Sequence, residues 1–185
     1  MGNDADRYYR FLDGDDNSLR EIIEIYYNGL TLYINSIVKN IFETEEIIQE
    51  IFVKLAVRKP KFNGKCEFKT WLYTIARNCA LNYITRHRSK FSTKQIDELS
   101  LLSDTADVER EYLLTEQKIE LHKAMKELKP EYFQVLYLMY FENFDTADIA
   151  KIMRKSKRQV GDLVYRAKKS LKSKLEKAGF KYEKL

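Results

Sequence analysis

Apolar residues recur at helical spacing along most of the chain, and this period constrains the fold more than any other feature of the sequence. After Ser18, for example, Leu19, Ile22 and Tyr26 fall on one helix face. No stretch of the sequence indicates a strand. Two prolines and six glycines in 185 residues are also too few for the turns of a β-sandwich or barrel. The sequence therefore predicts an all-α fold.

The predicted helices fall into two groups on either side of a weakly periodic segment. We expect them at about 18–41, 44–59, 71–88, 111–128, 131–142, 146–153 and 157–177. Residues 89–109 are rich in Ser, Thr and Asp, a composition typical of linkers. We therefore expect two small helical domains, 1–90 and 111–185, joined by a flexible linker at 91–110.

The charges are distributed unevenly along the chain. Residues 58–94 carry ten Lys and Arg but one acidic residue, and residues 157–185 carry ten against three. The segments between and before these blocks are acidic overall. Such runs often lie on solvated helix faces. Two separate basic blocks, each at the end of a helical group, favour two surfaces that bind a polyanion such as nucleic acid.

Several functional classes lack the residues that they require. The chain has two cysteines, Cys66 and Cys79, without the spacing of a zinc site, and two histidines far apart, His87 and His122. It has no Gly-rich phosphate loop, no apolar run long enough to span a membrane and no signal peptide. The sequence therefore predicts a cytoplasmic protein that is not an enzyme, with no metal, no cofactor and no membrane insertion.

The stretch 144–174 has the pattern of a helix-turn-helix. Ile149, Ala150, Val160, Val164, Ala167 and Leu171 occupy the inward positions. A recognition helix in the major groove uses Arg to read guanine, Gln to read adenine and Asp to read cytosine. The outer face of the second helix offers these residue types, with Lys for phosphates: Arg158, Gln159, Asp162, Tyr165, Arg166 and Lys169. A plain basic amphipathic helix is the alternative.

Aromatic and cationic residues alternate between positions 62 and 88. This pattern suits single-stranded nucleic acid, because bases stack on aromatic rings while cations neutralise the phosphates. The alternative is that Trp71 and Phe68 are core residues. The candidate residues are Phe62, Asn63, Lys65, Phe68, Lys69, Trp71, Arg77 and Asn78.

The acidic residues of the second predicted helix form a further candidate site. Glu45, Glu46 and Glu50 lie close together, but the sequence offers no facing Glu-x-x-His helix that would complete a carboxylate metal site. A protein contact face is the better interpretation.

Two stretches of the sequence resemble a known family. EEIIQEIFVKL (45–55) and FNGKCEFKTWLYTIARNCALNYITRHR (62–88) are similar to region two of bacterial sigma factors. Within them, the run from Trp71 to Asn78 is highly specific. Residues 120–177, with ELKPEYFQVLYLMYFENFDTADIA and YRAKKSLKSKL, resemble region four. The resemblance covers about 18–90 and 111–177, and it is strongest to the extracytoplasmic-function group, which keeps only these two regions.

This resemblance implies partners and residue roles. It implies binding to core RNA polymerase, through the β′ clamp and the β flap, to promoter DNA, and to an anti-sigma factor where one exists. The segment that docks on the clamp corresponds to Glu46, Gln49, Glu50 and Phe52. The loop 62–69 and Asn78 correspond to the elements that capture a flipped base of the −10 strand, with Trp71 and Lys69 beside them. The positions that face the −35 duplex correspond to Gly161, Asp162, Tyr165 and Arg166.

The sequence also departs from the family at the helix-turn-helix. Arg154 stands at a usually Gly-like turn position, Gln159 replaces a common Thr, and Asp162-Leu163 replaces a Ser-Arg pair. These changes bear on the turn geometry and on the −35 base preference. The rival to a sigma factor is a dimeric helix-turn-helix regulator that does not associate with core polymerase. Such a regulator has no need of the aromatic, basic block before residue 90.

Overall fold

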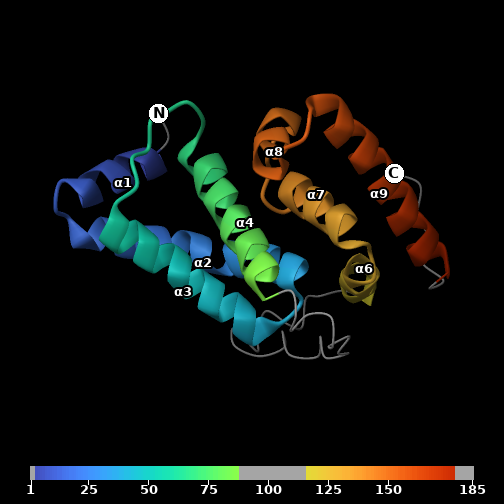
Figure 1. Cartoon of the computed structure of the whole chain (residues 1–185). Helices are drawn as coiled ribbons and strands as arrows, with labels where there is room; N and C mark the ends of the chain where they lie inside the picture. Colours follow the sequence, from blue (N-terminus) through green and yellow to red (C-terminus); the bar gives the residue numbers. More distant parts are fainter. Residues whose placement is uncertain (1–2, 88–115, 178–185) are drawn as a thin grey trace.

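The computed structural model describes residues 3–87 and 116–177, and every regular element in these residues is an α-helix (Figure 1). The all-α prediction is therefore confirmed. The predicted linker 91–110 lies outside the described residues. We call the helices before it the N-terminal unit and those after it the C-terminal unit. The helices are α1 (Asn3–Leu12), α2 (Asp16–Val38), α3 (Ile41–Arg58), α4 (Phe68–Arg86), α6 (Glu116–Lys126), α7 (Pro130–Tyr140), α8 (Thr146–Met153) and α9 (Lys157–Lys177).

Side-chain caps fix where α2 and α3 begin. The Asp15 carboxylate accepts a hydrogen bond from the Ser18 hydroxyl at 2.6 Å, which lowers the pKa of that carboxyl group. The first predicted helix was expected to reach Ile41, and this is wrong. Lys39 turns into the left-handed region with φ 58°, and Asn40 caps a new helix by accepting from two backbone N–H groups. The chain therefore changes direction before Ile41.

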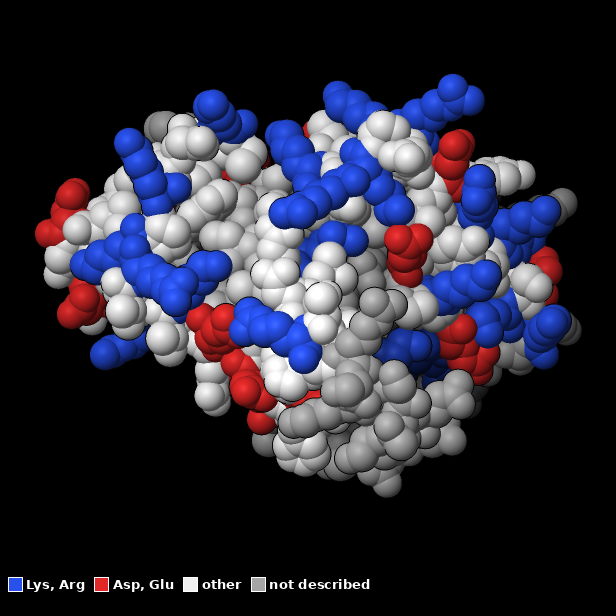
Figure 2. Space-filling model, viewed as in Figure 1, with Lys and Arg blue, Asp and Glu red and all other residues white. Residues whose placement is uncertain are grey.

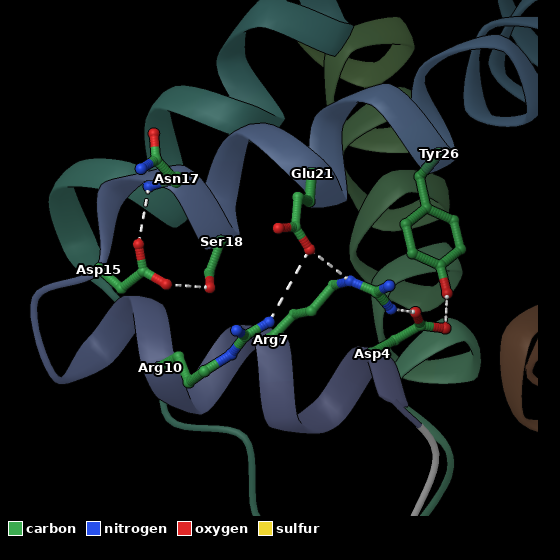
Figure 3. A network of polar contacts seen from close by, with 8 residues as sticks. All are labelled: Asp4, Arg7, Arg10, Asp15, Asn17, Ser18, Glu21 and Tyr26. Atoms are coloured by element: carbon green, nitrogen blue, oxygen red, sulfur yellow. Dashed lines mark hydrogen bonds and ion pairs between the residues drawn. The ribbon is translucent and has the colours of Figure 1, made fainter.

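Helix α1 was not predicted from the sequence, although it is firmly attached to the N-terminal unit. Tyr8 is fully buried, and its ring packs against Phe68 and Trp71 of α4. Figure 3 shows the polar contacts that fix α1 to α2. The Arg7 guanidinium lies 2.7 Å from Glu21 and 2.8 Å from Asp4, and the Tyr26 hydroxyl donates to Asp4 at 2.6 Å.

Helices α8 and α9 form the predicted helix-turn-helix. Arg154 adopts φ 53° and ψ 47°, which is the left-handed conformation that a glycine would take most easily. The backbone N–H of Lys155 then donates to the Ala150 carbonyl, which closes the end of α8. Helix α9 starts with a reciprocal capping box between Ser156 and Gln159. The turn is therefore kept even without the glycine.

The inward face of α9 is rotated slightly from the predicted one. Val160 and Ala167 are fully buried, as expected. Val164 and Leu171 are only partly buried, whereas Leu163, which was not predicted, belongs to the core. The spacing from Val160 to Leu163 and Ala167 is that of a single helix stripe.

The two units pack against each other and share one hydrophobic core. Helix α4 packs on α8, and α2 packs on α7, so the C-terminal unit lies along one side of the N-terminal unit (Figure 1). The rings of Tyr73 and Phe144 meet edge to face across this interface, with centroids 5.1 Å apart. The sequence predicted both units, but it did not predict this contact between them.

Candidate nucleic-acid interface

An open pocket of about 330 Å³ lies beside the loop between α3 and α4. Its wall comes from this loop, from the first turn of α4 and from the start of α1. It therefore includes part of the segment that the sequence predicted to bind single-stranded nucleic acid, together with α1 residues that sequence reasoning missed. We call it the loop pocket. Its lining residues are Asp4, Ala5, Phe62, Gly64, Cys66, Glu67, Phe68 and Lys69.

The aromatic residues of the predicted site serve mainly as core residues. Phe62 and Phe68 line the loop pocket but are only 4% and 2% exposed. Trp71 is partly buried, and its ring lies 5.3 Å from those of Phe62 and Tyr8. The rings therefore form a cluster under the pocket, where they hold α1, the loop and α4 together. An open stacking platform for several bases is not present in this arrangement.

The polar residues of this segment are more accessible. Asn63 and Lys65 are exposed, and the Asn63 side chain accepts from the Lys65 backbone N–H at 3.2 Å, which shapes the turn of the loop. Arg77 and Asn78 lie more than two turns beyond Phe68 on α4, and both are partly buried. These two residues lie further along α4 and do not line the loop pocket.

Lys69 has a partner that the sequence did not predict. Its ammonium nitrogen lies 2.8 Å from Oε2 of Glu142 in the C-terminal unit. The same nitrogen donates to the Glu142 backbone carbonyl at 2.7 Å. Lys69 therefore lies at the loop pocket and at the contact between the units at the same time.

Helix α3 presents an exposed stripe beside the acidic residues that the sequence selected. Glu46, Gln49 and Glu50 are exposed, and Val53 and Val57 continue the same stripe with 58% and 76% exposure. We call these five residues the α3 face. Helical period places both valines on this stripe with Glu46 and Glu50, but they carry no charge, so the acidic pattern that selected the site did not include them.

The structure also qualifies two details of the α3 prediction. Phe52 is 8% exposed and belongs to the core, because it lies on the opposite side of α3 from the exposed stripe. It is therefore a supporting residue rather than a contact residue. The Tyr83 hydroxyl on α4 donates a hydrogen bond to the Glu46 carboxylate at 3.1 Å. Burial is the main cause, and this hydrogen bond the second, that raises the pKa of Tyr83 to about 12.

The outer face of α9 is continuous and basic. All seven predicted −35 residues are exposed, with Tyr165 at 70%. Figure 2 shows Lys and Arg side chains gathered over α9. The Gln159 carboxamide oxygen caps the helix by accepting from the Ser156 backbone N–H at 2.8 Å, which leaves its NH₂ group to face outward. The seven residues are Arg158, Gln159, Gly161, Asp162, Tyr165, Arg166 and Lys169.

Within the described residues, no three His, Cys, Asp or Glu side chains come together in a way that could hold a metal ion. His87 lies against Tyr83, with ring centroids 4.3 Å apart. None of the described helices is both long and apolar enough to cross a lipid bilayer.

A helix-turn-helix with a basic outer face, packed beside a helical unit whose α3–α4 loop carries the exposed lysines Lys61 and Lys65, defines a two-part DNA-binding protein. Comparison with known families agrees with this class. Residues 22–90 match the Sigma-70 region 2 family, and residues 118–171 match the Sigma-70, region 4 family.

Curated relatives are similar over nearly their full length. The chain is 27% identical to the RNA polymerase sigma factor YlaC of Bacillus subtilis (strain 168) over 163 residues, covering 88% of this chain and 94% of the relative. It is 25% identical to the ECF RNA polymerase sigma factor SigM of the same strain, and this match covers 84% of the chain and 94% of the relative. The chain belongs to the family of extracytoplasmic-function RNA polymerase sigma factors. It is an alternative sigma factor, and sigma factors are transcription initiation factors.

Solved structures share the fold. RpoE in complex with the anti-sigma factor NepR from Bartonella quintana gives a TM-score of 0.64 at 18% identity, covering 85% of this chain and 96% of that one. CnrH in complex with the cytosolic domain of CnrY gives a TM-score of 0.63 at 14% identity, and the match covers 94% of this chain and 97% of that one. The two-unit helical arrangement is therefore shared with proteins of very different sequence.

Proposed function

We propose that this sigma factor binds core RNA polymerase through the α3 face and directs it to promoters that its two units read separately. The domain of residues 1–90 would contact the −10 element and that of residues 111–185 the −35 element, with 91–110 as the link. The observation that carries the proposal is the outer face of α9, where all seven predicted DNA-contact residues are exposed together on a helix-turn-helix. Because the link makes the second contact intramolecular, neither unit needs to bind tightly alone.

The −10 contact is assigned to the loop pocket and the adjoining part of α4. A pocket of about 330 Å³ has room for one base, and the cationic Lys65 and Lys69 near it can neutralise phosphates. Asn63 and Asn78 supply amide groups for hydrogen bonds with base edges. The packed rings of Phe62, Phe68 and Trp71 hold the wall of the pocket in place. Arg77 lies next to Asn78 on α4.

The −35 contact is assigned to the outer face of α9. Arg158, Asp162 and Arg166 follow one another at four-residue spacing, so they lie on one line along the helix. Such a line follows the floor of the major groove when the helix enters it. Gly161 adds no side chain, which lets the backbone of α9 come close to the DNA. Lys169 lies one turn beyond Tyr165, where phosphate is the expected partner.

The polymerase contact is assigned to the α3 face. Glu46, Gln49 and Glu50 supply charge and hydrogen-bonding groups, and Val53 and Val57 add apolar surface that a partner can bury. This mixture of exposed apolar and charged groups is typical of a protein interface rather than of a DNA-binding surface.

The proposal describes a specificity subunit without catalytic activity of its own, which works in the cytoplasm with the polymerase. Of the two solved structures described above, one is a complex with the anti-sigma factor NepR and the other a complex with the cytosolic domain of CnrY. An anti-sigma factor is therefore a further proposed partner, and the β flap is the proposed contact of the C-terminal unit on the polymerase.

The test is co-purification with core polymerase, followed by transcription from genomic DNA fragments that the resulting holoenzyme retains. The double variant Glu46→Lys, Glu50→Lys should lose polymerase binding while its helical content stays unchanged. The double variant Glu21→Lys, Glu24→Lys on α2 makes the same change in charge and should still bind, although it loses the Arg7 bond to Glu21. If both variants bind equally well, the α3 assignment is wrong. Tight dimeric DNA binding without polymerase would instead support the rival regulator.

A further inference from the structure

The two units are joined by a charged contact that involves Lys69. Its ammonium group is bound by the Glu142 carboxylate and by the backbone carbonyl of the same residue. The same group lies 4.9 Å from the centre of the Phe144 ring, at a distance typical of a cation–π contact. Glu142 is 13% exposed, so the pair is largely shielded from water. The C-terminal unit therefore surrounds much of the charged end of Lys69.

The Glu142 carboxylate is itself fixed by its neighbours. The Tyr137 hydroxyl lies 2.9 Å from Oε1 of Glu142 and 3.2 Å from the backbone carbonyl of Gly29 on α2. A Cβ at Gly29 would lie 2.6 Å from the same Oε1, so the absence of a side chain there allows the units to approach. A shielded carboxylate held in one position binds a cation more strongly than a flexible surface carboxylate does.

Lys69 also lines the loop pocket that we assign to the −10 strand. A DNA phosphate and the Glu142 carboxylate are both anions, so they compete for the same ammonium group and repel each other. We propose that Glu142 is an intramolecular competitor of promoter DNA, which keeps the chain closed by occupying Lys69 until the two units separate. This inference rests on the role proposed above for Lys69 in −10 binding.

The competition has a quantitative consequence. If only a fraction of the molecules is open, the apparent dissociation constant for DNA is the intrinsic constant divided by that fraction. Weakening the closed contact therefore tightens DNA binding, up to the limit where all molecules are open. By linkage, DNA binding must in turn favour separation of the units.

The experiment uses the full chain and a labelled single-stranded DNA that the wild-type chain selects from a randomised pool. We expect Glu142→Ala and the shape-conserving Glu142→Gln to bind this DNA about three- to tenfold more tightly than the wild type. Small-angle scattering should give a larger radius of gyration for both variants. Glu131→Gln is the matched control, because Glu131 also lies on the C-terminal unit and pairs at 3.2 Å with Lys155 of that same unit. It should change neither quantity.

Gly29→Ala provides a second variant that changes neither member of the ion pair. Its new methyl group should push Glu142 away and shift affinity and radius in the same direction as Glu142→Ala. It also meets the Tyr73 hydroxyl at 2.6 Å, so the helical content of the variant is measured alongside.

The outcomes separate the inference from the function on which it rests. If Lys69→Ala weakens DNA binding while the Glu142 variants bind as the wild type does, the competition is refuted and the −10 assignment stands. If the double variant Lys69→Ala, Glu142→Ala binds the selected DNA as well as Glu142→Ala alone does, the −10 role of Lys69 fails and the inference fails with it, because the closed ion pair is absent from both proteins. Tighter binding by the Glu142 variants without any change in the Glu131 control supports the competition.

Discussion

The hydroxyl of Tyr8 donates a hydrogen bond to the backbone carbonyl of Pro60 at 2.7 Å, and this bond connects α1 to the loop that precedes α4. The same ring lies 5.3 Å from those of Phe68 and Trp71. Helix α1 therefore supports the loop pocket from behind, although it precedes the segment that matches the region 2 family. The shape of the proposed −10 site depends on a helix outside that match.

The first prediction concerns the Tyr8 hydroxyl. Tyr8→Phe keeps the ring packing but leaves the Pro60 carbonyl without this donor, so it should lower the free energy of unfolding by about 1 kcal/mol. Urea unfolding of the two proteins measures the difference. Tyr27→Phe, at a 40% exposed position on α2, is the control and should change stability by less than about 0.5 kcal/mol. Equal stabilities of Tyr8→Phe and the wild type would show that the bond does not hold α1.

The same residue predicts a loss of stability at alkaline pH. Burial raises the pKa of Tyr8 to about 12 from an ordinary value of 10. Because the folded pKa is the higher one, the contribution of Tyr8 is fully present below pH 10 and is lost as pH rises towards 12. Other buried tyrosines add to this loss. The decline in stability between these pH values should therefore be smaller in Tyr8→Phe than in the wild type, as measured by unfolding at a series of pH values.

The turn of the helix-turn-helix gives a third prediction. Arg154 is exposed and holds a left-handed backbone conformation that is strained for any residue with a Cβ atom. Arg154→Gly should therefore raise the free energy of unfolding by about 0.5–1 kcal/mol, after the greater entropy of glycine in the unfolded chain is subtracted. Arg154→Ala keeps the Cβ atom and should give no such gain. A loss of stability in the glycine variant would mean that the Arg154 side chain stabilises the turn by its own contacts.

Much of the fold was predictable because its signals are local. Helical period placed seven helices, and the Asp15 and Asn40 caps explain two of their starts. Helix α1 also carried a signal, since Ala5, Tyr8 and Leu12 share one face, but its short polar sequence concealed it. The outward positions on α9 followed from the same period, although its core face is rotated towards Leu163 and extends to Leu175, neither of which was predicted.

The contact between the units was not predictable in the same way. Lys69 and Glu142 are 73 residues apart, and no local pattern connects a lysine at the start of α4 with a glutamate after α7. Helical period did place Phe52 on the apolar face of its helix, with Ile48 and Leu55, and its assignment as a contact residue came from the family resemblance alone. The period of an amphipathic helix gives its apolar face, whereas the helix that packs on this face depends on the whole fold.

The α3 face gives a fourth prediction. Val53→Gln removes exposed apolar surface without changing charge or helix-forming tendency to a large degree. If a partner buries the Val53 side chain, the variant should lose about 1 kcal/mol of binding free energy, which lowers its affinity for core polymerase roughly fivefold. Ile25→Gln, at a 50% exposed position on α2, is the matched control and should bind as the wild type does. Binding titrations with labelled polymerase measure both, and equal affinities would remove Val53 from the interface.

The last prediction separates base reading from phosphate binding on α9. Asp162 and Lys169 are both exposed, but a carboxylate is repelled by phosphates, so Asp162 can contribute only by accepting from a base or by orienting a neighbouring arginine. A cytosine N4 amino group is the natural donor, and a contact of this kind discriminates between bases by about 1–3 kcal/mol. Asp162→Ala should therefore change the preferred base at one −35 position.

Lys169→Ala should instead weaken all promoters to a similar degree, because a phosphate contact does not depend on sequence. It should also reduce the slope of log affinity against log salt by about one. Selection from a promoter library by holoenzymes carrying each variant measures base preference, and salt titrations on one selected promoter measure the slope. If Asp162→Ala keeps the wild-type preference at every −35 position, Asp162 does not read the DNA, directly or through Arg158 or Arg166.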